Sequence, residues 1–152
     1  MRVVSRALQL GHTELSIVLT NDDKIQKLNA MYRSLDAPTD VLAFAMREGE
    51  GGHVHGQLLG DVVVSVETAR SQAARHGRDV LSEVTMLIVH GVLHLLGWDH
   101  DTRAKNARMR AETDRLCHLA ARPSISGPRS SGRRRKSALP KPSQGRRSRA
   151  RP

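Results

Sequence analysis

The sequence of 152 residues has little cysteine, few aromatic residues and no long apolar run. Its single cysteine, Cys117, excludes an internal disulfide framework and a four-cysteine zinc or iron–sulfur site. No stretch approaches the roughly 18–20 consecutive apolar residues that cross a membrane, and the start lacks the apolar run of a secretory signal. We therefore expect a cytoplasmic protein without a membrane partner. The arginine-containing, acid-poor start also fits a short organellar presequence, although an opening amphipathic helix is the preferred interpretation.

Acidic residues are absent from residues 122–152, which contain 11 of the 25 Lys and Arg residues and five of the six prolines. Residues 1–120 hold the other 14 basic residues and all 15 acidic ones, so their net charge is −1. A basic segment with almost no large apolar residue cannot bury enough surface to offset the entropy lost on ordering. The sequence therefore predicts one domain in residues 1–120 and a disordered basic tail in residues 121–152.

The spacing of apolar residues predicts helices and strands within the domain. Alternating and β-branched residues indicate strands at Glu14–Thr20, Asp40–Met46 and Leu58–Val66. Capping residues and helical spacing indicate helices at the start of the chain, from Asn21 through Tyr32, at Glu67–His76, from Asp79 to Leu95, and from Asp101 or Thr102 to about Ala120. Apolar residues nearly encircle the Asp79–Leu95 helix after Val84, so this helix belongs in the core. The glycine content of Glu48–Gln57 is typical of a loop.

Three histidines, His90, His94 and His100, have a spacing typical of metal ligands. Two histidines four residues apart on a helix lie about 40° apart around the axis and about 6 Å apart along it. Gly97 allows the chain to turn and to bring His100 back over the same face. Three neutral nitrogen ligands with a fourth position open are typical of a catalytic zinc site, so we expect one zinc ion per chain. The alternative is three unrelated histidines packed or solvated separately, which would leave the desolvation of imidazoles on an apolar helix without an offset.

Carboxylates near these histidines could orient a ligand imidazole by a hydrogen bond. The candidates are Asp61, Asp99 and Asp101. Their spacing does not separate this role from that of a solvated loop residue or a helix cap, and both interpretations stay open.

The same histidine spacing occurs in the metzincin proteases, which carry a glutamate directly after the first histidine as general base. Here that position is Gly91, which can neither take a proton nor hold a water molecule. A peptide hydrolase is therefore an alternative function that Gly91 disfavours. A metal ion that lowers the pKa of bound water to about 7 still provides a hydroxide without an adjacent carboxylate.

Three motifs together resemble the YbeY family of endoribonucleases, also described as rRNA maturation factors. The resemblance covers about Glu14 to Leu116, in the family's order. The motifs are Leu28-Asn29-x-x-Tyr32-Arg33-x-x-Asp36-x-Pro38-Thr39-Asp40-Val41-Leu42, then Leu59-Gly60-Asp61, then His90-Gly-x-Leu-His94-Leu-Leu-Gly97-x-Asp99-His100.

This resemblance implies a small α+β domain with a mixed sheet packed against helices, and one zinc ion held by His90, His94 and His100. It implies metal-dependent cleavage of single-stranded RNA, in maturation of the 16S rRNA 3′ end and in ribosome quality control, with the small ribosomal subunit and its associated factors as partners. Arg33 matches the family's functionally important arginine, and its guanidinium can hold two phosphate oxygens in the transition state. We therefore assign catalytic roles to Arg33 and to His90. A non-catalytic ribosome-assembly factor, in which zinc secures the helix and the following turn, is a further alternative.

The sequence departs from the family pattern at several positions. Val-Leu-Ser-Phe-Pro is the usual family segment, whereas Ala43 and Ala45 replace its serine and proline here. The family also has a strand before its first helix, so either the start lies further upstream or the sheet has one strand fewer. Basic residues stand where the family is acidic after His100, and we interpret them as a solvated helix face: Arg103, Lys105, Arg108 and Arg110.

The 11 positive charges of residues 122–152 form a polyelectrolyte that RNA phosphates attract through counterion release, without sequence preference. The segment has no aromatic residue, so base stacking does not contribute to this attraction. The hypothesis is a nonspecific rRNA tether, and the alternative is an inert solubilising extension.

Removal of residues 122–152 is therefore expected to weaken RNA binding and to flatten its dependence on salt, because fewer counterions are released. Affinities for single-stranded RNA, measured between low and physiological salt for the full chain and the shortened one, test this. An unchanged salt slope would contradict the tether.

Overall fold

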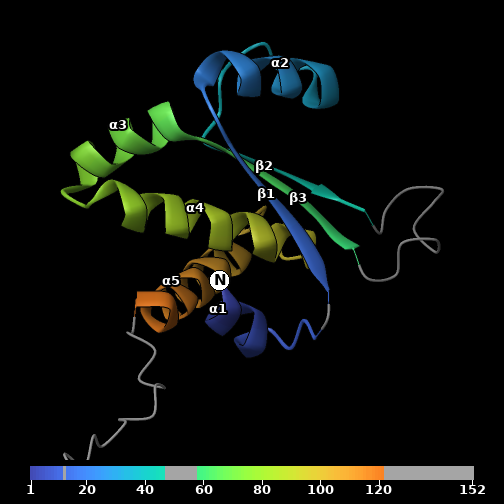
Figure 1. The fold of residues 1–152 in the computed structure, drawn as a ribbon, viewed down its shortest axis with the longest axis vertical. Helices are drawn as coiled ribbons and strands as arrows, with labels where there is room; N and C mark the ends of the chain where they lie inside the picture. Colours follow the sequence, from blue (N-terminus) through green and yellow to red (C-terminus); the bar gives the residue numbers. More distant parts are fainter. Residues whose placement is uncertain (12, 47–57, 122–152) are drawn as a thin grey trace, which may run out of the picture.

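The computed structural model describes residues 1–11, 13–46 and 58–121, which form one sheet and the helices around it (Figure 1). The strands are β1 (Glu14–Thr20), β2 (Val41–Ala45) and β3 (Leu58–Ser65). The helices are α1 (Arg2–Ala7), α2 (Asp22–Arg33), α3 (Val66–His76), α4 (Val80–Leu95) and α5 (Arg103–Ala121). The expected Glu48–Gln57 loop lies outside the described residues, as does the expected disordered tail apart from Ala121, which is the last residue of α5.

The sheet is mixed, with strand order β1-β3-β2. Strand β1 runs parallel to β3, and β2 runs antiparallel to it. Val62 in the middle of β3 pairs with Ile17 of β1 on one side and with Ala43 of β2 on the other. The expected α+β class with a small mixed sheet is confirmed, and both β1 and β2 have one edge without a partner strand among the described residues.

Short polar side chains set where the helices begin. The side chain of Asn21 accepts a hydrogen bond from the Lys24 backbone, and Asp79 accepts one from Ser82, which satisfies amide groups that have no partner within the helix. Thr102 takes this role for α5, because its hydroxyl accepts from the Lys105 backbone at 3.2 Å. Of the two predicted caps, Asp101 and Thr102, the hydroxyl residue is therefore the one used.

The expected end of the third strand at Val66 is wrong by one residue. Ser65 is fully buried, and its side chain accepts a hydrogen bond from the Thr68 backbone at 3.3 Å. This contact makes Ser65 the N-terminal cap of α3, so Val66 becomes the first helical residue.

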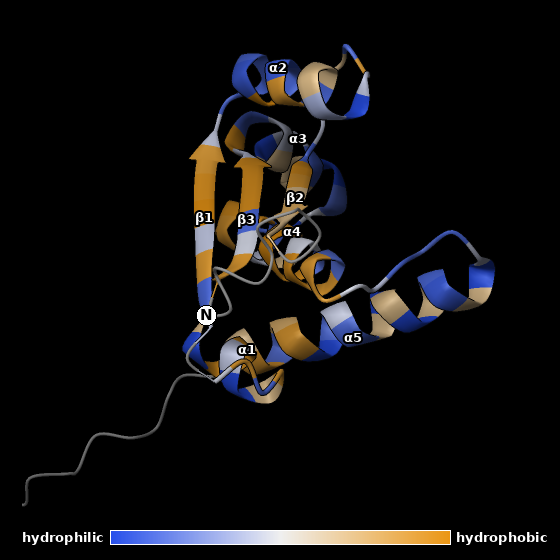
Figure 2. Ribbon diagram, turned by 90° about the vertical axis from the view of Figure 1, so that its right-hand side faces the viewer, coloured by the Kyte–Doolittle hydropathy of each residue, from blue (hydrophilic) through white to orange (hydrophobic). Residues whose placement is uncertain are grey.

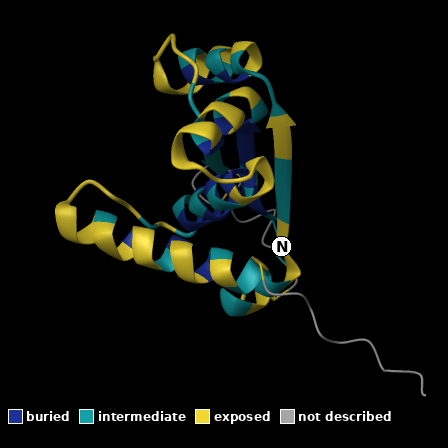
Figure 3. Ribbon diagram, turned by 90° about the vertical axis from the view of Figure 1, so that its left-hand side faces the viewer, coloured by how far each residue is buried: buried dark blue, intermediate teal, exposed yellow. Residues whose placement is uncertain are grey.

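Helix α4 lies in the core, as its apolar sequence predicts. One side packs against the sheet, where Val62, Val64 and Val92 belong to one buried cluster. The other side packs against α1 and α5 through a second cluster of Val4, Val89, Leu93, Met109 and Leu116. Burial of each such side chain stabilises the fold by roughly 1.5–3 kcal/mol. The strands and α4 carry most of the apolar colour in Figure 2, whereas α5 is buried only along the side that faces the core (Figure 3).

Helix α2 covers the opposite face of the sheet from α4 (Figure 1). Ile25 in its first half is fully buried with Leu42 and Val63 of the sheet. Its last turn behaves differently, because Met31 and Tyr32 are exposed. The helical spacing of apolar residues therefore predicted the helix correctly, but the sheet covers only part of it.

One charged side chain is completely buried among the described residues. Glu83, in the first turn of α4, lies 3.2 Å from Nδ1 of His76 and 3.5 Å from Nη1 of Arg78. Burial of a carboxylate requires such partners, so this cluster ties the end of α3 to the start of α4. No helix within the described residues is long and apolar enough to cross a bilayer.

Gly60 of β3 has no room for a side chain and has a backbone conformation that other residues rarely adopt. Its φ is +146°, and an added Cβ would lie 2.2 Å from the backbone oxygen of Phe44 and 3.0 Å from Leu95. Backbone strain and the steric clash act together there.

Gly60→Ala is therefore expected to lower the free energy of unfolding by about 3 kcal/mol. Gly97→Ala is the matched control, since its φ is +82° but an added Cβ would meet nothing within 4 Å, and it should cost about 1 kcal/mol. Urea unfolding of both variants measures the difference. Equal losses in the two variants would contradict the close approach at Gly60.

Candidate metal centre

Three imidazole rings converge at the C-terminal end of α4. His90 and His94 lie one turn apart on the same face of the helix, with ring centroids 4.8 Å apart. The ring of His100, beyond the end of the helix, lies 5.0 Å from His94 and 5.8 Å from His90. One ligand atom from each ring lies within 4.8 Å of the other two, so these residues could hold a metal ion.

A tight turn after α4 brings His100 back to the helix. Gly97 adopts a φ of +82°, a left-handed conformation that glycine reaches without a Cβ penalty. Its backbone N–H donates to the carbonyl of His94 at 2.9 Å, and the N–H of Trp98 donates to that of Leu93 at 3.0 Å. The Asp99 side chain then accepts from the backbone N–H of His100 at 2.6 Å. The structure thus brings the third ring into place by the turn that the glycine predicts.

The environment keeps His90 and His94 neutral. Burial and the neighbouring His94 and His100 lower the pKa of His90 to about 4. Burial, followed by the charge of His100, also lowers the pKa of His94. Neutral imidazole has the free lone pair that a metal ion requires, and three nitrogen donors on a partly buried site suit zinc. The donor set therefore fits a divalent metal ion.

The carboxylates that the sequence singled out serve the turn and α5. Asp99 and Asp101 both contact the amino group of Lys105, at 3.0 and 2.9 Å. The hydrogen bond from Lys105 is the main cause that lowers the pKa of Asp99 to about 2. Asp99 and Asp101 are therefore solvated residues of the turn, and the charge of Asp99 also raises the pKa of His94 against the effect of burial. Asp61 lies in β3, opposite Phe44 of β2.

Asp40 is the carboxylate near the histidines that the sequence analysis missed. Its negative charge raises the pKa of His90 against the lowering effect of burial. Both carboxylate oxygens are held, one by the Val41 backbone at 2.8 Å and the other by the Gln72 side chain at 2.9 Å. Asp40 stands in the quoted Thr39-Asp40-Val41 segment, but only the pairing of β2 with β3 places it beside α4.

Arg33 is the last residue of α2 and is exposed. Its positive charge contributes to the lowered pKa of His94, after burial and the charge of His100. Arg33 therefore acts electrostatically on the histidine cluster although it comes from the other face of the sheet. The catalytic roles of Arg33 and His90 stay predictions.

Gly91 faces the sheet and has no room for a side chain. An added Cβ would lie 2.7 Å from Cγ1 of Val62 and 3.3 Å from Cγ2 of Val41. The glutamate that serves metzincin proteases at this position would not fit between α4 and the sheet. The structure therefore adds a steric argument against the protease alternative.

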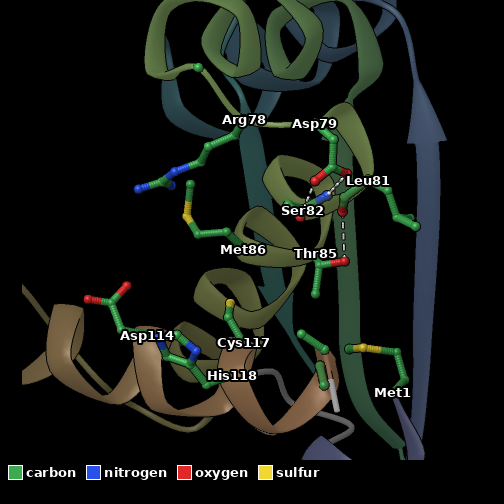
Figure 4. A pocket seen from close by; sticks show the side chains of 13 residues that line it. Met1, Arg78, Asp79, Leu81, Ser82, Thr85, Met86, Asp114, Cys117 and His118 are labelled. Carbon is green, nitrogen blue, oxygen red and sulfur yellow. Dashed lines mark hydrogen bonds between the residues drawn. The ribbon is translucent and has the colours of Figure 1, made fainter. Parts of the chain in front are cut away.

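A groove in the described residues lies away from the histidine cluster. It measures about 640 Å³ and is formed by the start of α4, the end of α5 and Met1 (Figure 4). Cys117 lines this groove, and burial raises the pKa of its thiol, which disfavours the reactive thiolate. No residue of the histidine cluster lines the groove, and Cys117 packs against the buried cluster that joins α1, α4 and α5.

Metal binding by the three histidines can be measured directly. The full chain is expected to bind about one zinc ion, because three convergent imidazoles supply the ligands. His94→Ala should lower zinc affinity more than roughly 100-fold, since loss of an outer hydrogen bond alone costs about 10–100-fold. Competition with a chelating dye measures this, with His118→Ala, an exposed histidine of α5, as control. Equal affinities of His94→Ala and wild type would contradict the site.

Comparison with known proteins gives a consistent result. The family model described as Endoribonuclease YbeY matches residues 2–120. A protein named Endoribonuclease YbeY from Heliobacterium modesticaldum is 49% identical over 115 residues, covering 70% of this chain and 69% of the relative. Its namesake from Aquifex aeolicus is 50% identical over 95 residues, covering 62% and 61%, and that from Symbiobacterium thermophilum is 42% identical over 125 residues, covering 76% and 80%.

A solution structure of a Thermotoga maritima protein has the same fold. Its TM-score is 0.55 at 24% sequence identity, and the match covers 78% of this chain and 73% of that one. The family match spans the sheet, both catalytic candidates and all three histidines. The chain therefore belongs to the endoribonuclease YbeY family.

Proposed function

We propose that this protein is a zinc-dependent endoribonuclease that cleaves single-stranded RNA. Family membership carries the general activity, hydrolysis of RNA phosphodiester bonds. The single observation that supports metal dependence is the convergence of His90, His94 and His100, with ligand atoms within 4.8 Å of one another. The lowered pKa values of His90 and His94 support a metal site rather than a pair of charged histidines.

His90, His94 and His100 would hold the zinc ion and leave a position open toward solvent. A zinc ion in such a site supplies a Lewis acid and lowers the pKa of a bound water to about 7. Burial is the main cause that lowers the pKa of His90, and it outweighs the charge of Asp40, which raises this pKa. Burial therefore keeps His90 neutral and its ring nitrogen free to bind the metal ion, which is the basis of its proposed catalytic role.

Arg33 would bind the phosphate of the RNA substrate. A phosphodiester gathers negative charge in the transition state, and a planar guanidinium can donate two parallel hydrogen bonds to its oxygens. Arg33 is exposed and no ion pair occupies it among the described residues. Its charge also acts on His94, one of the three histidines of the cluster.

The proposal extends to the biological setting. Residues 1–120 would be the catalytic domain, and residues 121–152 a basic tether for rRNA, since 11 positive charges without acids favour a phosphate backbone. The substrate would be the 3′ end of 16S rRNA, in maturation and in ribosome quality control. The protein would then act in the cytoplasm with the small ribosomal subunit and its associated factors.

One observation favours a second candidate, a non-catalytic assembly factor. The histidine cluster joins the end of α4 to the turn before α5, so a metal ion there would also fasten these elements. This alternative predicts that His94→Ala lowers the unfolding temperature and that the metal-loaded protein cleaves no RNA.

Arg33→Ala is expected to lower kcat/KM for single-stranded RNA by about 10²–10³-fold, the usual loss for one transition-state hydrogen-bond donor. His94→Ala and chelation should abolish cleavage. Arg70→Ala, an exposed arginine of α3, is the matched control and should leave cleavage unchanged. An unstructured protein substrate belongs in the same assay. Cleavage of that protein without cleavage of RNA would overturn the proposed function.

A further inference from the structure

The last turn of α2 exposes large apolar side chains. Met31 is 72% exposed, Tyr32 is 62% exposed and Leu35, just after the helix, is 57% exposed. The chain has three aromatic residues in all, and burial of aromatics contributes strongly to a core. Exposure of one of them is therefore unusual for a fold with so few.

Tyr32 is held from one side by Phe44. The two ring centroids lie 4.9 Å apart with an interplanar angle of 62°, an edge-to-face contact. Phe44 itself is anchored, because it packs partly against the buried cluster of Ile25, Leu42 and Val63. This contact orients the Tyr32 ring while most of its surface stays accessible to solvent.

Strand β2, which carries Phe44, runs beside the end of α4 that carries the histidine cluster. The backbone oxygen of Phe44 and the Leu95 side chain both border the empty Cβ position of Gly60. Leu95 follows His94 directly on α4. Figure 2 shows the sheet edge-strand β2 between the end of α2 and α4. Arg33 follows Tyr32 in the chain, and its positive charge contributes to the lowered pKa of His94.

We propose that Tyr32, oriented by Phe44, is a stacking platform for an unpaired nucleobase of the RNA substrate. This inference rests on the proposed function, because it takes RNA as the substrate of the neighbouring site. Tyr32 and Arg33 are both exposed in the last turn of α2, so they can contact a base and a phosphate of one RNA segment. An aromatic face beside an arginine is the usual composition of single-strand binding surfaces.

This assignment also gives a reason for single-strand selectivity. A base in a duplex is stacked and paired on both sides, so its face is not available to Tyr32. Every base has a π-face, and stacking therefore tolerates any sequence. The expected selection is for unpaired segments rather than for a particular base.

Binding of RNA to the full chain provides the test, with chelator present so that no cleavage occurs. The two probes are a single-stranded oligoadenylate and a ribose-phosphate strand of the same length without bases. Tyr32→Ala should weaken oligoadenylate binding about tenfold, since one stacked base contributes this order of affinity, and should leave binding of the base-free strand unchanged. Tyr32→Phe should retain wild-type affinity. Leu81→Ala is the matched control, because Leu81 is 75% exposed at the far end of α4.

The outcomes separate this inference from the proposed function. Equal losses on both probes, or no loss on either, would overturn the stacking platform. Cleavage by Tyr32→Ala with an unchanged KM would also overturn it and would leave the nuclease intact. A wild-type protein that shows base-dependent, Tyr32-dependent binding but no metal-dependent cleavage would overturn the nuclease and support the platform. The supporting result for both is a raised KM with a retained kcat in Tyr32→Ala.

Discussion

The histidine cluster depends on the burial of α4 between the sheet and the α1–α5 pair. This helix carries two of the three rings, and its position is set by apolar contacts on both sides, with Val62 and Val92 on one and Val89 and Leu93 on the other. A helix held in this way cannot rotate without exposing one of its apolar faces. His90 and His94 therefore point in a fixed direction before any metal ion arrives, which lowers the cost of ordering the ligands.

Burial also sets the chemistry of the rings. The helix that aims the histidines also removes water from them, so the charged forms are disfavoured and the pKa of His90 falls to about 4. Mutual repulsion of His90, His94 and His100 acts in the same direction. Asp40 and Arg33 modify this balance with opposite signs, one raising the pKa of His90 and the other lowering that of His94. The cluster is thus electrically asymmetric, with a cation on the side where we place the phosphate.

The two ends of helix α2 have different roles: the first half packs on the sheet, and the last turn is exposed to solvent. Its first half anchors the helix on the sheet through Ile25, which is completely buried. Its last turn extends beyond this contact and presents Tyr32 and Arg33 to solvent. Rigid attachment at one end and exposure at the other are suited to a surface that must hold a flexible single strand in register with a fixed site.

The sequence by itself determined the features that depend on neighbours in the chain. The helical spacing of His90 and His94, the turn at Gly97 and the caps at Asn21 and Asp79 all follow from local geometry, because they involve residues within about two turns of one another. The core position of α4 was also predictable, since an apolar surface around a whole helix must be covered on all sides.

Only the tertiary structure decided which distant residues meet. The charge of Asp40 raises the pKa of His90 because the pairing of β2 with β3 places Asp40, just before β2, on the side of the sheet near α4. His76, which the sequence left without a role, lies against the buried Glu83 because α3 folds back onto α4. The exposure of Tyr32 depends on how far the sheet extends under α2. Strand order and helix coverage arise from contacts between segments remote in the chain, and apolar spacing within one segment holds no information about its partner.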